Sequence, residues 1–258
     1  MFSKEELQQG LNTRTIGTKI FVFETIDSTN ACAKTLGDAG TEEGSVVVAE
    51  FQTNGRGRHG RSWIADPGVN LLLSVLLRPV IPKDLAGLLT LYASVAIARA
   101  VEKASGCPIE CKWPNDLLLN GKKFCGILLE NTIQQSGLSY SVIGAGVNVN
   151  QTAFPPELEQ RATSLARECS TTYDRKELLQ RILREMDSLY DDVRLGKLDR
   201  VSKEWANRCT MFGQLVTVEQ HDRTISGVAV KLHYDGGLVL ETPTGTTTVY
   251  AGDVTVVV

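Results

Sequence analysis

Residues 55–61 read Gly-Arg-Gly-Arg-His-Gly-Arg and follow an apolar run at 46–51. Glycine permits positive φ and lets backbone N–H groups approach an anion closely. Arginine adds a planar cation that binds phosphate or carboxylate through two hydrogen bonds. A strand that enters such a loop predicts a polyphosphate site. Two other interpretations stay open from these residues alone, a basic arm on nucleic acid and a solvated surface loop.

A second group of polar residues surrounds a predicted β-hairpin between residues 111 and 130. Asn120-Gly121 is the favoured central pair of a two-residue type I′ turn. That turn predicts two cross-strand pairs, Leu119 with Lys122 and Leu118 with Lys123. Side-chain alternation then puts four residues on one face, namely Asp116, Leu118, Lys123 and Cys125. An acid and a base on that face indicate either a structural salt bridge or part of a site.

The segment 141–150 alternates with period two. Its apolar face consists of Ile143, Ala145, Val147 and Val149. Its other face is small and polar, and consists of Gly144, Gly146, Asn148 and Asn150. Glycine weakens a strand unless something must approach its backbone closely. This face is predicted to be a floor for a flat ligand, with Asn148 as its hydrogen-bonding edge, although packing under a helix would also explain the glycines.

Composition narrows the class of protein. The 258 residues suffice for one large domain and a small one, and a net charge of −3 argues against a dedicated nucleic-acid binder. Six cysteines without a C-x-x-C pair, with only three histidines, indicate free thiols rather than a zinc site. The first residues lack the features of a signal peptide, and polar residues interrupt the longest apolar stretch, 85–101. We therefore expect a cytoplasmic protein that does not cross a membrane.

Periodicity and turn signals predict the elements that must position these residues. Strands are predicted at 20–23, 46–52 and 70–77, and helices at 31–36, 83–104, 174–196 and 198–209. Asp174 and Glu177 are spaced as a capping box. The last predicted helix ends a larger domain, 1–210. Short strands with close-set turns then predict a small SH3-like barrel in a second domain, 211–258.

Four motifs, taken in order, resemble those of biotin protein ligases. They are Asp27-Ser28-Thr29-Asn30; Gln52 with Gly55–Arg61 and Trp63; Lys112-Trp113-Pro114-Asn115-Asp116 with Lys123 and Gly126; and Gly144-Ala145-Gly146-Val147-Asn148. The resemblance runs from about residue 19 to 150 and includes the small terminal barrel; His59 stands where an arginine is common. It implies an α+β fold with a mixed, mainly antiparallel sheet and helices, as in class II aminoacyl-tRNA synthetases. About 19 residues precede the first strand, so we expect a form without an N-terminal DNA-binding domain.

The resemblance implies two half-reactions. Biotin and ATP give biotinyl-5′-adenylate and pyrophosphate, and a lysine of the biotin carboxyl carrier domain of a carboxylase, such as acetyl-CoA carboxylase, then takes the biotinyl group. Cations must offset the repulsion between biotin's carboxylate and the α-phosphate, and the catalytic candidates are Lys123, Arg56 and Arg58. Biotin-binding candidates are Ser28, Thr29, Asn30, Gln52, Arg56, Gly57, Arg58, Lys123, Gly126 and Gly144. Nucleotide-binding candidates are Arg58, Arg61, Trp63, Lys112, Asn115, Asp116, Lys123 and Asn148.

Mg²⁺ is expected to accompany ATP. Asp116 either helps to position the ion or orients Lys123, and the sequence leaves both roles open. Lipoate– or octanoate–protein ligase is the alternative enzyme, with the same adenylation chemistry, and a nucleic-acid-binding module is the alternative of another class. The expected partners are biotin, ATP and the carrier domain, without DNA or a membrane. Whether the protein forms a homodimer stays open.

Overall fold

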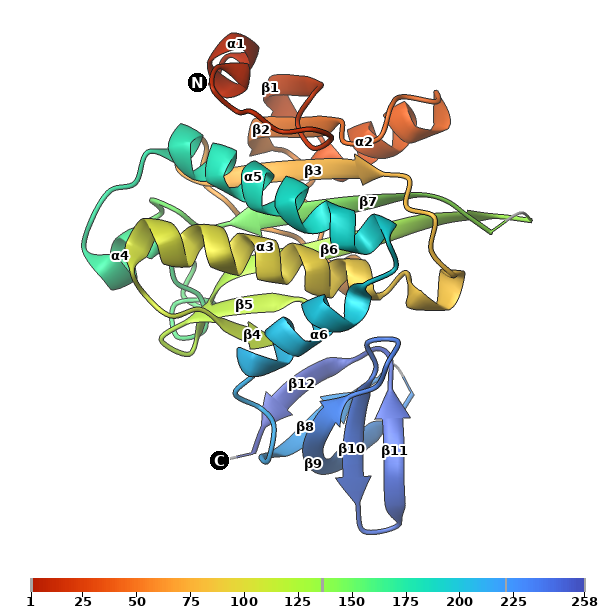
Figure 1. The fold of residues 1–258 in the computed structure, drawn as a ribbon. Helices are drawn as coiled ribbons and strands as arrows, with labels where there is room; N and C mark the ends of the chain where they lie inside the picture. The colour runs from red at the N-terminus through yellow and green to blue at the C-terminus, as the bar shows by residue number, and fades with distance from the viewer. Residues whose placement is uncertain (1, 136, 221, 258) are drawn as a thin grey trace.

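Seven strands form one mixed sheet in the computed structural model, which describes residues 2–135, 137–220 and 222–257. β1 and β2 are parallel, and the other neighbouring strands are antiparallel. In spatial order the strands are β1 (Ile20–Ile26), β2 (Val46–Gln52), β3 (Leu71–Leu77), β7 (Gly137–Val147), β6 (Lys122–Gln134), β5 (Asp116–Leu119) and β4 (Glu110–Lys112) (Figure 1). The predicted mixed, mainly antiparallel sheet is confirmed.

Three helices cover one face of the sheet and enclose the main hydrophobic core: α3 (Leu88–Ser105), α5 (Arg175–Arg194) and α6 (Leu198–Asn207) (Figure 1). α5 begins after Asp174, whose carboxylate accepts the backbone N–H groups of Lys176 and Glu177. Glu177 forms an ion pair with Arg181 at 2.6 Å instead of the reciprocal contact that a capping box requires. The predicted helix cap is therefore present, with a different role for Glu177.

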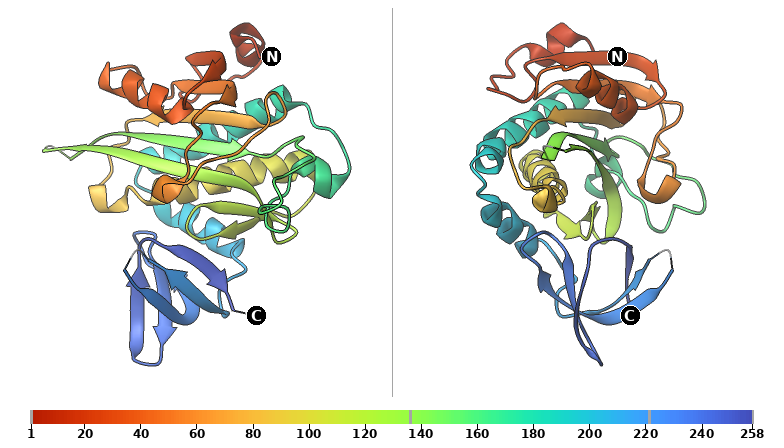
Figure 2. Two further views of the ribbon diagram at one scale, coloured as in Figure 1. Left: turned by 180° about the vertical axis from the view of Figure 1, so that it is seen from behind. Right: turned by 90° about the vertical axis from the view of Figure 1, so that its right-hand side faces the viewer.

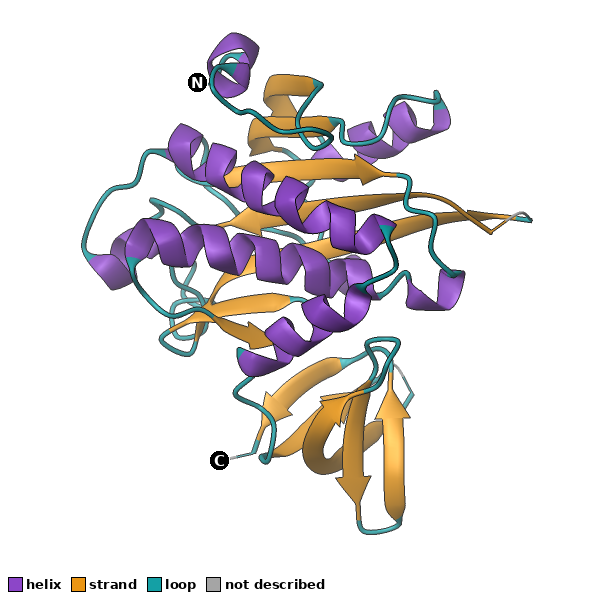
Figure 3. Cartoon of the chain, viewed as in Figure 1, coloured by secondary structure: helices purple, strands orange, loops and turns teal. Residues whose placement is uncertain are grey.

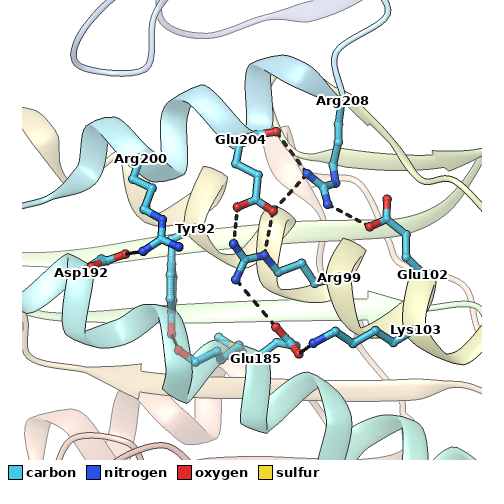
Figure 4. Close-up of polar contacts among 10 residues, drawn as sticks. Tyr92, Arg99, Glu102, Lys103, Glu185, Asp192, Arg200, Glu204 and Arg208 are labelled. Carbon is cyan, nitrogen blue, oxygen red and sulfur yellow. Dashed lines mark hydrogen bonds and ion pairs between the residues drawn. The ribbon is translucent and has the colours of Figure 1, made fainter.

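Ion pairs join the three helices to one another (Figure 4). Glu204 of α6 accepts the Arg99 Nε–H of α3 at 2.7 Å and lies 3.1 Å from Arg208 Nη1. Arg208 also reaches Glu102 at 2.9 Å, and Arg99 lies 3.9 Å from Glu185 of α5. Because the two arginine side chains are mostly buried, this network fixes the relative positions of the helices.

Helix α2 (Thr29–Asp38) packs on the opposite face at the β2–β3 end of the sheet. A small core there contains Ala33, Val47, Leu76, Tyr140 and Val142. Seen from behind, the loop that holds the short 3₁₀ turn η1 (Arg58–Gly60) crosses the rest of this face (Figure 2). The Gly/Arg loop therefore lies on the side of the sheet away from α3, α5 and α6.

Five antiparallel strands form a separate C-terminal sheet of SH3-like type (Figure 3). They are β8 (Leu215–Glu219), β9 (Thr224–Leu232), β10 (Leu238–Thr242), β11 (Gly245–Val249) and β12 (Asp253–Val256). The Trp113 indole N–H donates to Gly236 O at 3.0 Å, and the Cys111 N–H donates to Arg208 O at 2.9 Å. These bonds connect the β4 edge of the large sheet to the C-terminal part.

Several helix boundaries differ from the prediction. The segment Lys83–Ser105 is a 3₁₀ turn, η2 (Lys83–Leu85), followed by α3, and it is long and apolar enough to cross a membrane by length and composition. Since 72% of its most apolar window is buried among the sheet, α5 and α6, it is the core helix of this fold. Two five-residue helices, α1 (Lys4–Gln8) and α4 (Leu165–Cys169), were not predicted, because they are too short to show an apolar period.

The β5–β6 hairpin corrects one prediction. Leu119 pairs with Lys122 and Leu118 with Lys123, as expected. The register then shifts, so that Leu117 pairs with Cys125. A bulge adds one residue to β6 and turns every later side chain to the opposite face. Cys125 is therefore fully buried in the core, on the face opposite Asp116 and Lys123.

Candidate active site

The loop from Gly55 to Arg61 closes on itself through its backbone. The Gly57 N–H donates to Arg61 O at 2.7 Å, and the Trp63 N–H donates to Gly55 O at 3.0 Å. A Cβ atom on Gly55 would lie 2.7 Å from Trp63 O, so this position excludes a side chain. The base of the loop is therefore narrow.

Two of these arginines contact other parts of the chain. Arg58 is half-buried, and its Nη1 donates to Asn115 Oδ1 at 3.1 Å and to Gly252 O at 3.4 Å. Burial lowers the pKa of the Arg58 guanidinium, and the nearby Asp116 opposes that effect. Arg61 forms an ion pair with Asp253 of β12. Arg56 is exposed, so Arg58 is the loop cation held at the sheet.

Asp116 is the centre of a cluster of cations. Its Oδ1 lies 2.6 Å from Lys123 Nζ, and the strand register places Asp116 of β5 opposite Lys112 of β4. Burial lowers the pKa of Lys112, and the charge of Asp116 acts in the opposite direction. Three cations, Lys112, Lys123 and Arg58, thus surround one carboxylate. Their excess positive charge in a partly buried site favours a phosphate ligand.

The glycines of β6 and β7 make room for an indole ring. A Cβ atom would lie 2.8 Å from the Trp63 ring at Gly126 and 2.3 Å from it at Gly146. Lys123 Nζ lies 5.6 Å from the centroid of the same ring. The small, polar face of the segment 141–150, predicted as a floor for a flat ligand, therefore contacts the Trp63 side chain directly. A flat ligand has to stack on the outer face of the indole. Gly144 likewise makes room for the Asn30 side chain, since a Cβ atom on Gly144 would lie 2.0 Å from Asn30 Oδ1.

A hydrogen-bonded network links the start of α2 to three strands. Asn30 Nδ2 donates to Glu130 Oε2 at 2.8 Å, and the Ser74 hydroxyl lies 2.6 Å from Asn30 Oδ1 and 2.8 Å from Thr29 Oγ1. Gln52 Oε1 accepts the Thr29 N–H at 2.7 Å and lies 2.9 Å from Thr29 Oγ1. Since each buried member has a partner, the network fixes where donors and acceptors point.

Ser28 caps helix α2 and remains able to donate. Its hydroxyl oxygen accepts the Ala31 N–H at 3.4 Å. A hydroxyl carries one proton and two lone pairs, so capping uses a lone pair only. The cap and a ligand contact are compatible at this residue.

An open cavity of about 440 Å³ lies between the Gly/Arg loop and β6. Its walls are residues 54–62 together with Leu128 and Glu130. Glu130 connects this cavity to the network through Asn30. The volume is that of a small-molecule site.

Asn148 is held by a segment, 161–168, that also holds Lys123. Asn148 Nδ2 donates to Thr163 O at 3.0 Å. The Thr163 N–H donates to Lys123 O, and the Lys123 N–H donates to Arg161 O, both at 2.9 Å. Asn148 Oδ1 is buried and has no hydrogen-bond partner within the described residues. Its buried, unpaired oxygen is an acceptor available to a ligand amine.

Asn150 was predicted on the same face as Asn148. Its side chain instead forms hydrogen bonds with the backbone N–H and C=O of Tyr173.

Comparisons with known proteins agree with this geometry. The sequence model of the "Biotin/lipoate A/B protein ligase family" matches residues 22–148, and that of the "Biotin protein ligase C terminal domain" matches residues 211–257. The "Bifunctional ligase/repressor BirA" of Bacillus subtilis is 35% identical over 254 residues, which are 98% of this chain and 78% of that protein. The chain belongs to the biotin protein ligase family.

Two further relatives support the assignment to this family. The "Biotin--[acetyl-CoA-carboxylase] ligase" of Mycobacterium tuberculosis is 35% identical over 88% of this chain and 85% of its own length. The biotin protein ligase of Aquifex aeolicus, solved in complex with biotin and ATP, has a TM-score of 0.80 and 28% identity. That match covers 93% of this chain and 98% of the solved one.

The residues near Asp116 do not make a metal site by themselves. Among the described residues no group of three or more His, Cys, Asp or Glu side chains could hold an ion. The Asp116 carboxylate is already paired with Lys123 and lies among further cations, which repel a divalent ion. In a biotin protein ligase, magnesium would therefore have to arrive with the phosphates of ATP.

The site residues predicted from sequence fall into two neighbouring groups. Around the network and cavity lie Ser28, Thr29, Asn30, Gln52, Arg56, Gly57 and Gly144. Around Asp116 and the indole lie Arg58, Trp63, Lys112, Asn115, Lys123, Gly126 and Asn148. Arg61 lines the cavity wall, but its guanidinium is directed to Asp253.

Sequence reasoning missed Ser74, Leu128, Glu130 and Thr163. Three of them carried a signal: Ser74 is the one polar residue in the run 71–77, and Leu128 and Glu130 continue the alternation that starts at Gly126. Thr163 acts through its backbone, which no residue type reveals.

Proposed function

We propose that this chain is a biotin–[biotin carboxyl-carrier protein] ligase. The observation that carries the proposal is the ion pair of Lys123 with Asp116 on a rigid hairpin, beside Arg58 and Lys112 and next to the loop-walled cavity. Membership of the biotin protein ligase family supports the same reaction.

In the first half-reaction, a carboxylate oxygen of biotin forms a bond to the α-phosphorus of ATP, and the bond from that phosphorus to pyrophosphate breaks. Both reactants are anionic, so the rate depends on cations placed where charge accumulates. Lys123 places a localised positive charge on the β5–β6 hairpin, and Arg58 places a planar guanidinium on the Gly/Arg loop. In the second half-reaction, a neutral lysine amine of the carrier attacks the acyl carbon, AMP leaves, and the new amide nitrogen loses a proton.

The finer assignments are part of the proposal. The Ser28 hydroxyl, with Thr29, Asn30 and Gln52, would bind the ureido ring, whose one carbonyl and two N–H groups match such a set. Trp63 would stack on the adenine and Asn148 would accept from its amino group. Magnesium would enter with ATP, and the partner would be a biotin carboxyl carrier domain in the cytoplasm. Residues 1–210 would carry the chemistry, with 211–258 as a second domain.

A direct test compares three acids. The full chain is incubated with ATP, magnesium and biotin, lipoate or octanoate, and pyrophosphate release and acyl-adenylate are measured. We expect release with biotin only, followed by labelling of one lysine when a purified carrier domain is added. Release with lipoate or octanoate and none with biotin would contradict the proposal.

A further inference from the structure

Two cysteines that are 62 positions apart in the chain lie in contact. Cys107 Sγ and Cys169 Sγ are 3.4 Å apart. Cys107 follows Gly106, the left-handed residue that ends α3, and Cys169 is the last residue of α4. Both are half-buried. The end of α3 and the helix α4 meet at this point (Figure 1).

We propose that Cys107 and Cys169 are a disulfide-forming site that joins α4 to the end of α3. The sulfur atoms have to approach by about 1.4 Å to reach a bond length of about 2.05 Å. With a peroxide as oxidant, one thiolate displaces hydroxide from the peroxide to give a sulfenic acid. The second thiol displaces water from it, so two thiols and one H₂O₂ give one disulfide and two H₂O.

The other four cysteines are arranged differently. Cys111 and Cys125 are buried in the core, and burial raises the pKa of both thiols. Cys209 is half-buried, and burial raises its pKa to about 11. Cys32 lies on α2 and contacts no other thiol within the described residues. Cys111 and Cys209 are partners in an isolated β-bridge, but Cys107 and Cys169 are the pair whose sulfur atoms are in contact among the described residues.

The proposed bond would act on a segment that holds the active site. Cys169 directly follows the 161–168 segment, which is bonded through its backbone to Lys123 and Asn148. Glu168 also stabilises this segment through two hydrogen bonds. Its Oε1 accepts from the Thr163 hydroxyl at 2.6 Å, and its Oε2 accepts from Asn120 Nδ2 at 2.7 Å. A disulfide at Cys169 fixes the far end of the same segment and so reduces its local opening.

The environment of Cys169 disfavours its thiolate. Burial raises the pKa of the Cys169 thiol, and its neighbours Cys107 and Tyr173 contact it. A raised pKa lowers the fraction of thiolate at neutral pH, and the thiolate is the reacting species. Mildly alkaline solution therefore favours the participation of Cys169.

The test uses the full chain without biotin or ATP, incubated with dilute hydrogen peroxide at mildly alkaline pH. We expect the intact mass to fall by about 2 Da, the mass of two hydrogens. A non-reducing digest should contain a peptide with Cys107 joined to Cys169. The midpoint of thermal unfolding should rise by roughly 5–10 °C, because the bond closes a long loop, and dithiothreitol should reverse the rise.

Cysteine variants and hydrogen exchange distinguish the proposed disulfide from general oxidation of the protein. Cys107→Ser and Cys169→Ser should each abolish the crosslink and the shift, whereas the matched control Cys32→Ser should keep both. The Thr163 and Leu165 amides should exchange more slowly in the oxidised protein. A crosslink between other cysteines, a gain of oxygen atoms without a crosslink, or unchanged exchange at these amides would overturn the inference. The peptide map and exchange data of the unmodified chain decide the case even if a serine variant fails to fold.

Discussion

At the scale of single residues, the position of Asp116 determines what Lys123 can do. A lysine has a long flexible side chain, and its ammonium is a useful catalytic charge only when something fixes it. The 2.6 Å contact with Asp116 supplies that restraint, and Lys112 and Arg58 keep the local charge positive. We therefore propose an orienting role for Asp116.

Lys123→Gln should slow the first half-reaction by about 10²–10³-fold, which is typical for the loss of one preorganised donor at a developing charge. Glutamine keeps a hydrogen-bonding group and removes the cation. Biotin binding without ATP should fall less, because the predicted ureido contacts come from Ser28, Thr29 and Gln52. Pyrophosphate release and biotin titration measure the two effects.

The neighbouring Lys122 provides the control for that variant. Lys122 pairs with the buried Leu119, on the side of the hairpin opposite Lys123. Lys122→Gln should therefore leave pyrophosphate release near normal. If both variants are equally impaired, the cation is not acting through its position beside Asp116.

Gly146→Ala should raise the KM for ATP by tenfold or more. The added methyl group would lie 2.3 Å from the Trp63 ring, so the indole has to leave the surface on which adenine is proposed to stack. Gly87→Ala is the matched control, since that residue has helical φ and its nearest neighbour would be 3.7 Å away. An unchanged KM for ATP in Gly146→Ala would remove Trp63 from the proposed nucleotide site.

Residue types allowed most of the site to be predicted, for a physical reason. The site depends on properties that belong to particular residue types. Lys123 supplies a charge, Arg58 supplies a planar guanidinium, and Gly146 has no side chain. Thr163 and Ser74 could not be found in this way, because a backbone carbonyl and a buried hydroxyl depend on which strands become neighbours.

At the scale of elements, the Gly/Arg loop is a narrow turn that Arg58 attaches to the sheet through Asn115. Arg58→Ala should loosen the loop and release biotinyl-adenylate at least several-fold faster. The escaped adenylate would then label exposed lysines of bystander proteins. Retention is measured by rapid filtration, and loop order by tryptic cleavage after Arg56 and Arg61 with and without biotin and ATP.

Arg14→Ala is a suitable control for the loop variant, because that arginine is exposed and pairs with Asp191 far from the cavity. We expect the adenylate to protect the loop of the control and of the unmodified chain from trypsin. Equal cleavage with and without the adenylate in the unmodified chain would show that the loop does not close over it.

Glu204→Gln should lower the free energy of unfolding by about 1–2 kcal/mol at neutral pH, since one carboxylate serves two mostly buried arginines. Burial acts to raise the pKa of Glu204, but Arg99 and Arg208 hold it below its ordinary value. The ionised carboxylate thus stabilises the fold above the pKa of the unfolded chain. That contribution is lost as pH falls through the lower folded pKa.

Denaturant unfolding of both proteins at several pH values measures this effect. The difference in unfolding free energy should shrink as the solution becomes acidic. Arg200→Gln, at an exposed arginine that lies 3.4 Å from Asp192, should change stability little. A constant difference between the Glu204→Gln and unmodified proteins across the acid range would contradict the assigned role.

Longer helices and strands were predicted more accurately than the shortest ones. The strand at 46–52 is a continuous apolar run and the helix from 174 has a clear helical period, and both were found with nearly correct limits. The bulge after Lys123 was not predicted, because nothing in Phe124-Cys125 distinguishes a bulged pair from regular alternation. The neighbouring strand β7 pairs with β6 from Cys125 onwards, directly after the bulge.

At the scale of the whole molecule, the C-terminal sheet contacts the Gly/Arg loop. Arg61 pairs with Asp253, and Arg58 donates to Gly252 O. The sequence predicted a separate barrel, but it could not show that residues 192 positions apart meet, since exposed ionic contacts carry no sequence pattern.

Asp253→Asn should shorten the retention of biotinyl-adenylate by about two- to fivefold, since an exposed ion pair is worth at most ~1 kcal/mol. The thermal midpoint should stay unchanged. Added salt should reduce the difference, because it screens the pair in the unmodified protein. Asp222→Asn, in the connection between β8 and β9, is the control, and equal retention in all three proteins at low salt would exclude a role for Asp253.

The position of Trp63 has an optical consequence. Of the three tryptophans, Trp113 and Trp205 are buried at 3% and 0% exposure, and Trp63 alone is half-exposed. A collisional quencher such as iodide should therefore reach one emitter in three, and the surrounding arginines should attract that anion. The protein thus contains an intrinsic fluorescent reporter at the loop base, and its emission can follow occupancy of the cavity without an attached dye.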